Sequence, residues 1–540
     1  MSSQVVPALQ TEHATNRPEP VRSLLGSLRE RVSRDTAILG ALVLGAAVLR
    51  LPTLTRAYWV DEGISVGIAG HRLTQLPRLL HLDGSPPLFY VLLHFWMRAF
   101  GSSEVSTHLM ALLTSLAVIP IAWWAADQLF GRGAALCAAL LSATSPFLAW
   151  YGTETRMYPL ACALSLLAVA LTVRAVRDRE LRDVVWASVA FVLLIYTHNW
   201  GLYVLVATVV VVALHGLWTR DRVELPCVAG AVAAIGVAYL PWLPSFLAQA
   251  RTTGAPWAVR PSFGDLFADP ASVLGGTLGA AIGPFLSFGV LAFRGAMKTA
   301  EANLAALILA VAGVTVLEGW LAAQLDPSWA SRYLAVALAP ALLGLAGVLG
   351  ASVGGRRVVQ ITAVVLAGWS VIGSLLPDAN ARYAKSNVAA VARAATPLLS
   401  PGDLVVVTQT EQLAVTAHYL PAGLAFATPL GAVSDPHVVD WRHLTERLAA
   451  ADACQTIAPQ IAALPTGAHV LVVNPFNRVG ASGTQWSYAV NLQVNRINEL
   501  LFDDPGLRLV SAFSPGVAPK PFSAVVGLLF VKEADTSPCS

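Results

Sequence analysis

Two adjacent carboxylates, Asp61 and Glu62, stand in the segment RAYWVDEGISV, directly after the first long apolar stretch of the chain. A carboxylate at such a position can cap a following helix or remain solvated in a loop. It can also act as a general base that accepts the proton of an attacking hydroxyl. The pair is the first candidate for catalysis, and the residues alone leave all three alternatives open.

Further polar residues recur beside other apolar stretches. They are acids, bases and phenols that one site could use: His81, Asp83, Glu154, Arg156, Tyr158, His198, Arg332 and Tyr333. Charges at the ends of membrane spans are costly unless they are paired or solvated, so their gathering on one side of a membrane indicates a polar cavity. Snorkelling helix ends and solvated loops are the alternative for any single member.

The two arginines of this set indicate the kind of ligand. A guanidinium stays charged and binds two oxygens at once, which suits a phosphate. Arg332 also stands at the expected start of a span, where free backbone amides favour an anion. In ETRMY, Glu154 and Tyr158 are four residues apart, so a helix beginning there would place both on one face with Arg156 at its mouth. A phosphate-bearing ligand is therefore expected.

A metal site is a further possibility. His81 and His198, together with Glu62 or Glu154, have the donor types that suit zinc or manganese. A lone histidine near the end of a span more often serves as a hydrogen-bonding residue. The sequence thus allows a divalent metal and makes no cofactor certain.

The composition determines the class of protein that carries these residues. The chain has 540 residues, of which 56% are hydrophobic and 12% charged, and apolar runs of about 18 residues or more recur, as in integral membrane proteins. The net charge is +3, and no basic cluster is interleaved with aromatics, so nothing indicates nucleic acid. Residues 1–35 lack the features of a signal peptide and are expected to form a cytoplasmic tail.

Apolar runs predict about eleven spans. They lie near 36–54, 105–127, 134–151, 158–176, 183–197, 200–217, 226–245, 271–293, 302–323, 333–351 and 358–376. Basic segments such as VRAVRDRELR and GGRRV then alternate onto the side of the basic N-terminus, which the positive-inside rule makes cytoplasmic. The candidate site residues fall on the opposite, outer face.

This alternation requires that residues 85–101 do not cross the membrane. Their apolar part is short, begins with two prolines and is rich in aromatics, as in a helix that lies at the membrane interface. Residues 55–104 are therefore expected to form one outer loop with interfacial helices.

The residues after 377 differ from the rest of the chain. Short β-rich runs at 402–409, 469–475, 507–513 and 524–532 alternate with helical patterns such as 441–464. They predict an extracytoplasmic α/β domain over 378–540, following a transmembrane module over 36–377. Cys454 and Cys539 would face an oxidising compartment there, where a disulfide between them is possible.

Several motifs together resemble one superfamily. They are the acidic pair, HLDGSPPLFYVLLHFWMRAFGSSE, SPFLAWYGTETRMY, THNWGLY, PWLPSF with APWAVRPS, and SRYL. In this order they resemble the GT-C membrane glycosyltransferases, nearest to the dolichyl-phosphate-mannose protein mannosyltransferases and the bacterial aminoarabinose transferases, over roughly residues 36–350. The resemblance implies a polyprenyl-phosphate sugar donor and a catalytic aspartate at the position of Asp61. The aminoarabinose transferases carry a lysine where this chain has Ser85, so phosphate binding would depend on Arg156 and Arg332.

The sequence thus predicts a multi-pass glycosyltransferase of the cytoplasmic membrane, with its site on the outer face. It would move one sugar from a polyprenyl phosphate to a lipid, glycan or protein hydroxyl, with inversion. A lipid-linked sugar transporter or flippase and a non-catalytic envelope scaffold are the alternatives. A transporter should place its ionisable residues near the middle of the membrane, whereas here they gather at one face.

Overall fold

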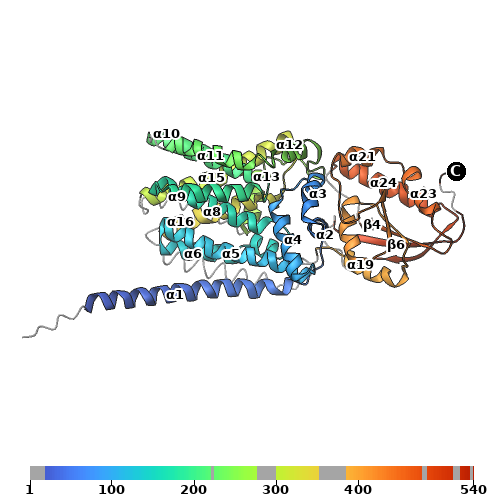
Figure 1. Ribbon diagram of the computed structural model, residues 1–540, viewed down its shortest axis with the longest axis horizontal. Coiled ribbons are helices and arrows are strands. Elements are labelled where there is room, and N and C mark those ends of the chain that lie inside the picture. Colours follow the sequence, from blue (N-terminus) through green and yellow to red (C-terminus); the bar gives the residue numbers. More distant parts are fainter. Residues whose placement is uncertain are drawn as a thin grey trace, which may run out of the picture.

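The computed structural model describes residues 19–220, 224–275, 299–351, 385–476, 483–514, 523–535 and 539. In these ranges, long helices form a bundle at one end of the molecule, and a sheet flanked by helices forms the other end (Figure 1). Three short helices from residues 60–100 lie between the two parts (Figure 1).

Long apolar runs give the bundle its helices. The main ones are α1 (Glu19–Arg50), α5 (Glu104–Phe130), α6 (Arg132–Thr144), α8 (Tyr158–Asp178), α9 (Leu181–Ile195), α10 (Gly201–Thr219), α11 (Glu224–Tyr239), α15 (Thr299–Leu325) and α16 (Ala335–Ala351). Among the described residues, six helices are long and apolar enough to cross a membrane. A seventh span results if α11 and α12 (Leu243–Thr252), which meet at 76°, form one broken span. The chain is a multi-pass membrane protein.

Six of the predicted spans coincide with these six helices: 36–54, 105–127, 158–176, 200–217, 302–323 and 333–351. The predicted span 226–245 falls on the bent pair. Those at 134–151 and 183–197 overlap the shorter helices α6 and α9, of 13 and 15 residues. The predicted span 271–293 lies mostly, and 358–376 entirely, outside the described residues. The total of eleven therefore stays a prediction.

The predicted outer loop contains three helices, α2 (Val60–Gly70), α3 (Leu76–Asp83) and α4 (Leu88–Phe100). The last of these covers most of residues 85–101 and has 13 residues, so it is about 20 Å long. This is shorter than the roughly 30 Å hydrocarbon core of a bilayer, as an interfacial helix requires. The helix packs on α2 and α5, between the bundle and the sheet (Figure 1).

The C-terminal part is a six-stranded mixed sheet of order β3-β2-β1-β4-β6-β5. Four strands confirm the predicted runs: β1 (Leu404–Val407), β4 (His469–Pro475), β5 (Leu507–Phe513) and β6 (Val525–Lys532). The short strands β2 (Ala425–Thr428) and β3 (Gly431–Val433) were not predicted, because each is too short to show an alternation of apolar and polar residues. Strand β1 runs parallel to both β2 and β4, while β6 is antiparallel to β4 and β5.

Helices cover both faces of this sheet. Val405 and Val407 of β1 pack with α19 (Val388–Ala395) and α20 (Leu413–Tyr419). The alternate residues Leu404 and Val406 pack with α22 (Ala453–Thr456), α23 (Ala458–Ala462) and α24 (Gln485–Phe502) on the other face. The predicted helical segment 441–464 is three short helices, the first being α21 (Leu444–Ala450). The predicted domain boundary at 377 lies outside the described residues.

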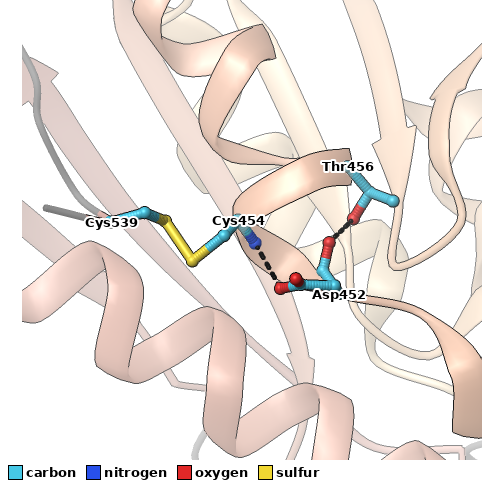
Figure 2. The surroundings of a disulfide bond; sticks show 4 residues. All are labelled: Asp452, Cys454, Thr456 and Cys539. Atoms are coloured by element: carbon cyan, nitrogen blue, oxygen red, sulfur yellow. Dashed lines mark hydrogen bonds between the residues drawn. A yellow bond between two sulfur atoms is a disulfide. The ribbon is translucent and has the colours of Figure 1, made fainter.

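A disulfide joins Cys454, in α22, to Cys539 near the C-terminus (Figure 2). Their Cα atoms are 5.8 Å apart, a usual separation for bonded cysteines. Asp452 caps α22 by accepting a hydrogen bond from the amide of Cys454 at 3.0 Å, as Figure 2 shows. The predicted pairing is confirmed, and it ties the C-terminal segment to the sheet domain.

Helix α2 also packs directly against the C-terminal domain. A Cβ atom added to Gly63 would lie 2.6 Å from Cα of Val415 in α20, and one added to Gly67 would lie 2.2 Å from the carbonyl oxygen of His437. These two glycines, four residues apart, share one helix face. Because neither has a side chain, the C-terminal domain approaches α2 closely at Gly63 and Gly67, each of which lies two residues after a polar residue of the site, Asp61 or Ser65.

Candidate active site

Asp61 lies in the first turn of α2, and its carboxylate faces two arginines. The Oδ2 atom is 3.8 Å from Nε of Arg156 and 3.9 Å from Nε of Arg332. Arg156 comes from the turn before α8, and Arg332 from the 3-10 turn η3 (Ser331–Leu334) that leads into α16. The structure thus brings together three predicted site residues from sequence positions up to 271 residues apart.

Both guanidinium groups keep unused donors. Arg156 Nη1 donates to the hydroxyl of Ser65 at 3.0 Å and to the carbonyl oxygen of Asp61 at 3.4 Å. The Nε atoms of Arg156 and Arg332 are buried and have no hydrogen-bond partner among the described residues. Two positive charges therefore surround one negative charge, and the remaining N–H groups are suited to the oxygens of an anion such as phosphate.

Aromatic rings hold Arg332 in place. Its guanidinium carbon is 4.5 Å from the ring centre of Trp257, 5.3 Å from that of Tyr333 and 6.0 Å from that of Trp59. Cation–π attraction at these distances fixes the direction of the head group. Tyr333, predicted as a site residue, thus contacts Arg332 through its ring.

Glu62 has a different environment from Asp61. Its side chain is fully buried, and both carboxylate oxygens accept hydrogen bonds from Lys385 Nζ at 2.9 Å. His108 Nε2 is 2.7 Å from Oε1, which also accepts the amide of Thr155 at 2.8 Å. Burial alone would raise the pKa of Glu62, but the charges of Lys385 and His108 outweigh burial and lower it. The carboxylate is therefore enclosed by protein donors.

Lys385 and His108 were not predicted. Lys385 stands at the start of the C-terminal domain, 323 residues after Glu62, and also donates to the carbonyl of Thr153 at 2.9 Å. Only four residues of the chain are lysines, against 31 arginines, so a single lysine beside apolar residues was an available signal. His108 lies inside the apolar run that forms α5 and not at its end, so its position did not indicate a site residue. The ion pair of Lys385 with Glu62 joins the C-terminal domain to α2, the helix that carries Asp61.

Glu154 lies close to this network but in a turn. The expectation that Glu154 and Tyr158 share one helix face is wrong, because residues 152–157 form turns and bends and α8 begins only at Tyr158. The side chain is buried, and its Oε2 atom has no hydrogen-bond partner among the described residues. Burial raises the pKa of Glu154 to about 7, which the charge of Lys385 opposes. Glu154 can therefore gain or lose a proton near neutral pH.

Asp83 belongs to the same region. It ends α3, and its Oδ2 accepts a hydrogen bond from the hydroxyl of Tyr90 at 3.2 Å. Burial raises its pKa, while the charge of Arg156 lowers it and that of Asp61 raises it further, so the three side chains interact electrostatically. His81 lies in the same helix but makes no hydrogen bond, ion pair or ring contact with the other side chains that the structure describes.

His198 lies between two site tyrosines. Its ring centre is 6.0 Å from that of Tyr158 and 5.2 Å from that of Tyr333. The amide of Trp200 donates to Nδ1 at 3.1 Å, which leaves Nε2 as the protonated nitrogen of the neutral ring. Burial, and then the charges of Arg156 and Arg332, lower the pKa of His198 to about 3. The imidazole is therefore neutral at physiological pH.

The possible metal ligands do not assemble. In the described ranges, no group of three or more His, Cys, Asp and Glu side chains is placed to hold a metal ion. The structure thus does not bring His81 and His198 together with Glu62 or Glu154 as a ligand set. The oxygens of Glu62 already accept hydrogen bonds from Lys385 and Thr155.

Comparison with known proteins supports the same grouping as the motifs. The sequence profile of the dolichyl-phosphate-mannose-protein mannosyltransferases matches residues 84–243. ArnT from Cupriavidus metallidurans, solved with bound undecaprenyl phosphate, aligns over 92% of this chain and 98% of its own length, at 17% identity and a TM-score of 0.56. The apo form of ArnT aligns over the same shares at 16% identity and a TM-score of 0.55. The arabinofuranosyltransferase AftD from mycobacteria covers 92% of this chain and 40% of its own at 15% identity, with a TM-score of 0.49.

No curated protein matches the chain by sequence. The chain has the fold of the GT-C membrane glycosyltransferases. Its residues 84–243 resemble the protein mannosyltransferases in sequence and its fold resembles that of ArnT, which confirms the resemblance inferred from the motifs.

Proposed function

We propose that this protein transfers one sugar from a polyprenyl-phosphate donor to a hydroxyl group on the outer face of the cytoplasmic membrane. The acceptor is a lipid, a glycan or a protein. One observation carries the proposal: a carboxylate, Asp61, lies within 4 Å of two arginines that retain unused donors. This is the pair of functions that the reaction needs, a base and an anion site, side by side.

The arginines would hold the leaving group. In the reaction, the bond between the anomeric carbon and the phosphate oxygen breaks, and negative charge develops on the departing polyprenyl phosphate. Arg156 and Arg332 would stabilise that charge in the transition state. No acid is then required to protonate the leaving group.

Asp61 would act on the other reactant. Its carboxylate would accept the proton of the acceptor hydroxyl while the hydroxyl oxygen bonds to the anomeric carbon. Attack from the face opposite the phosphate would invert the configuration at that carbon. The separations of 3.8 and 3.9 Å from the arginines are long for hydrogen bonds, so a bound phosphate could take over the guanidinium donors and release Asp61 for the acceptor.

The other predicted residues would support these steps. Glu62, predicted as catalytic, is enclosed by Lys385 and His108, so we assign it a positioning role that fixes the start of α2 and thereby Asp61. The remaining predicted residues would shape the donor site around the phosphate and its sugar: Glu154, Tyr158, Tyr333, Asp83, His198 and His81. Of these, Glu154 Oε2 and the Tyr158 hydroxyl are buried without a hydrogen-bond partner in the described ranges, so both are available to a ligand.

Two considerations support a lipid-linked donor. The site lies where the apolar bundle meets the short helices α2 to α4, so a prenyl chain could remain in the membrane while its phosphate reaches the arginines (Figure 1). ArnT, which shares the fold, was solved with bound undecaprenyl phosphate. The C-terminal domain would lie outside the membrane, on the same side as the site.

Product analysis with purified protein tests the proposal. The protein is incubated with a panel of polyprenyl-phosphate sugars, and transfer or hydrolysis is followed by mass spectrometry. Turnover of any donor identifies an enzyme, whereas binding without turnover would favour a transporter or a scaffold. Arg332→Ala should weaken donor binding at least about tenfold, because it removes a charge-assisted contact to phosphate. The exposed Arg260→Ala is the matched control and should leave binding unchanged.

A further inference from the structure

A buried polar segment of the C-terminal domain faces the catalytic helix. It consists of Gln409 and the 3-10 turn η5 (Thr410–Gln412), which follow strand β1. The exposed fractions of Gln409, Thr410 and Glu411 are 2%, 5% and 3%. The turn contacts α2, the helix that carries Asp61.

This segment has oxygens that the protein leaves unpaired. The Gln409 amide donates to Glu411 Oε1 at 2.7 Å. Gln409 Oε1, Thr410 Oγ1 and Glu411 Oε2 have no hydrogen-bond partner within the described part of the chain. Leaving a buried polar atom unpaired is costly, and such atoms are few in folded proteins. Three of them in three consecutive residues need a ligand to explain them.

Thr410, the middle residue of the three, lines a cavity. It has a volume of about 420 Å³ and lies between helix α3 of the outer loop and the β2–β3 hairpin. Thr410 and Thr428 line it on the side of the sheet, and Arg78 and Arg447 are among its other lining residues. Thr428 ends β2, and Gln409 follows the end of the parallel strand β1, so the segment lies at the edge where parallel sheets bind ligands.

We propose that Gln409, Thr410 and Glu411 form a subsite for a sugar, whose hydroxyl groups donate hydrogen bonds to their unpaired oxygens. The class of ligand follows from the atoms involved. An amide oxygen, a carboxylate oxygen and a hydroxyl oxygen can all accept, and a polyol supplies several O–H donors at once. The inference deepens the proposed function and rests on it, because it adds residues of the C-terminal domain to the recognition of a sugar.

The negative charge of Asp61 affects the protonation of Glu411 in this segment. Burial raises the pKa of Glu411 to about 7, and the negative charge of Asp61 raises it further. The two carboxyl groups are therefore close enough to interact across the interface. A sugar held by Glu411 would thus lie near the group proposed as the base.

The sugar could belong to the donor or to a glycan acceptor, and binding measurements separate the two. Dissociation constants are measured for wild type, Glu411→Gln and Thr410→Val with three probes. The probes are undecaprenyl phosphate without sugar, a panel of undecaprenyl-phosphate sugars, and a panel of soluble oligosaccharides. Glu499→Gln, an exposed position on α24, is the matched control. Thermal unfolding verifies that each variant is folded.

We expect both variants to bind undecaprenyl phosphate like wild type, because the arginines hold the phosphate. Each should lose about tenfold in affinity for a sugar-bearing probe, the usual effect of one hydrogen bond to a charged or buried group. A loss confined to the lipid-linked sugars assigns the subsite to the donor, and a loss confined to the oligosaccharides assigns it to the acceptor.

Sugar affinities within twofold of wild type in both variants would overturn the inference. So would wild-type protein that binds no lipid-linked sugar better than bare undecaprenyl phosphate and binds none of the soluble oligosaccharides. In either case Arg332→Ala, measured with bare undecaprenyl phosphate, reports separately on the phosphate site. The subsite can thus fail while the proposed function stands.

Discussion

Replacing Lys385 by methionine should destabilise the protein through Glu62. The Lys385 ammonium makes three hydrogen bonds of 2.9 Å, two to the Glu62 carboxylate and one to the carbonyl of Thr153, and both side chains are almost fully buried. Removing one partner of a buried ion pair leaves an uncompensated charge and typically costs about 3–5 kcal/mol. His108 remains as a second partner, so we expect the lower end of this range.

The dependence on pH gives this prediction a definite sign. In wild type the pKa of Glu62 lies below its ordinary value of 4.5. The stability that this carboxylate contributes is therefore complete above pH 4.5 and is lost as the pH falls through the lowered pKa. In Lys385→Met, the ammonium charge no longer opposes the effect of burial, so the pKa of Glu62 rises. The variant then takes up a proton in mild acid, which removes the buried charge. The stability difference between the two proteins should therefore shrink between pH 7 and pH 5.

Denaturant unfolding of the purified protein in detergent measures this difference at both values of pH. The double variant Lys385→Met with Glu62→Gln is the internal control, since it removes both charges and should recover part of the lost stability. A loss below about 1 kcal/mol, or a difference independent of pH, would refute the assignment of Lys385 as the main partner of Glu62.

Three further predictions concern the organisation of the chain. Gly67→Ala should weaken the contact between α2 and the C-terminal domain by about 1–3 kcal/mol, because the added methyl would lie 2.2 Å from a carbonyl oxygen. Faster hydrogen exchange at this interface would show the effect. Gly70→Ala is the control, since the nearest atom to its added methyl lies at 4.0 Å. Cys454→Ser should lower the stability of the C-terminal domain by about 2–4 kcal/mol, because the disulfide joins residues 85 positions apart in the sequence. An unfolding free energy of wild type that is the same with and without reductant would argue against this prediction. Single cysteines at positions 178 and 265 should react with an impermeant probe in intact cells only at 265, and the reverse result would invert the topology.

The sequence predicted those parts of the site whose chemistry is local. Asp61, Arg156 and Arg332 each stand at the edge of an apolar run, where a charge is conspicuous, and the structure brings them together. The strands β1, β4, β5 and β6 could be predicted for a similar reason, since each is a short run rich in β-forming residues between segments that lack this pattern. Position relative to a hydrophobic stretch is a property that a single sequence displays.

Other features depend on distant pairing and were not predicted. In the sequence Glu62 is equivalent to Asp61, but in the structure Lys385 and His108 enclose Glu62 alone, because side chains of adjacent residues in a helix point in different directions. Gly63 and Gly67 form a close-packed face only because a second domain lies against them. Glu154 lies in a turn and not in the expected helix, since a spacing of four residues indicates periodicity but not where a helix begins.

The most direct measurement compares turnover and donor binding in Asp61→Asn. The amide preserves the shape of the side chain but does not accept the proton of the acceptor hydroxyl. Turnover with the active donor should therefore fall by about two to four orders of magnitude. Donor affinity should stay the same or rise slightly, because the negative charge beside the phosphate is lost. The exposed Asp503→Asn is the control for the chemical change. An Asp61→Asn protein that transfers sugar at nearly the wild-type rate would contradict the assignment of Asp61 as the base.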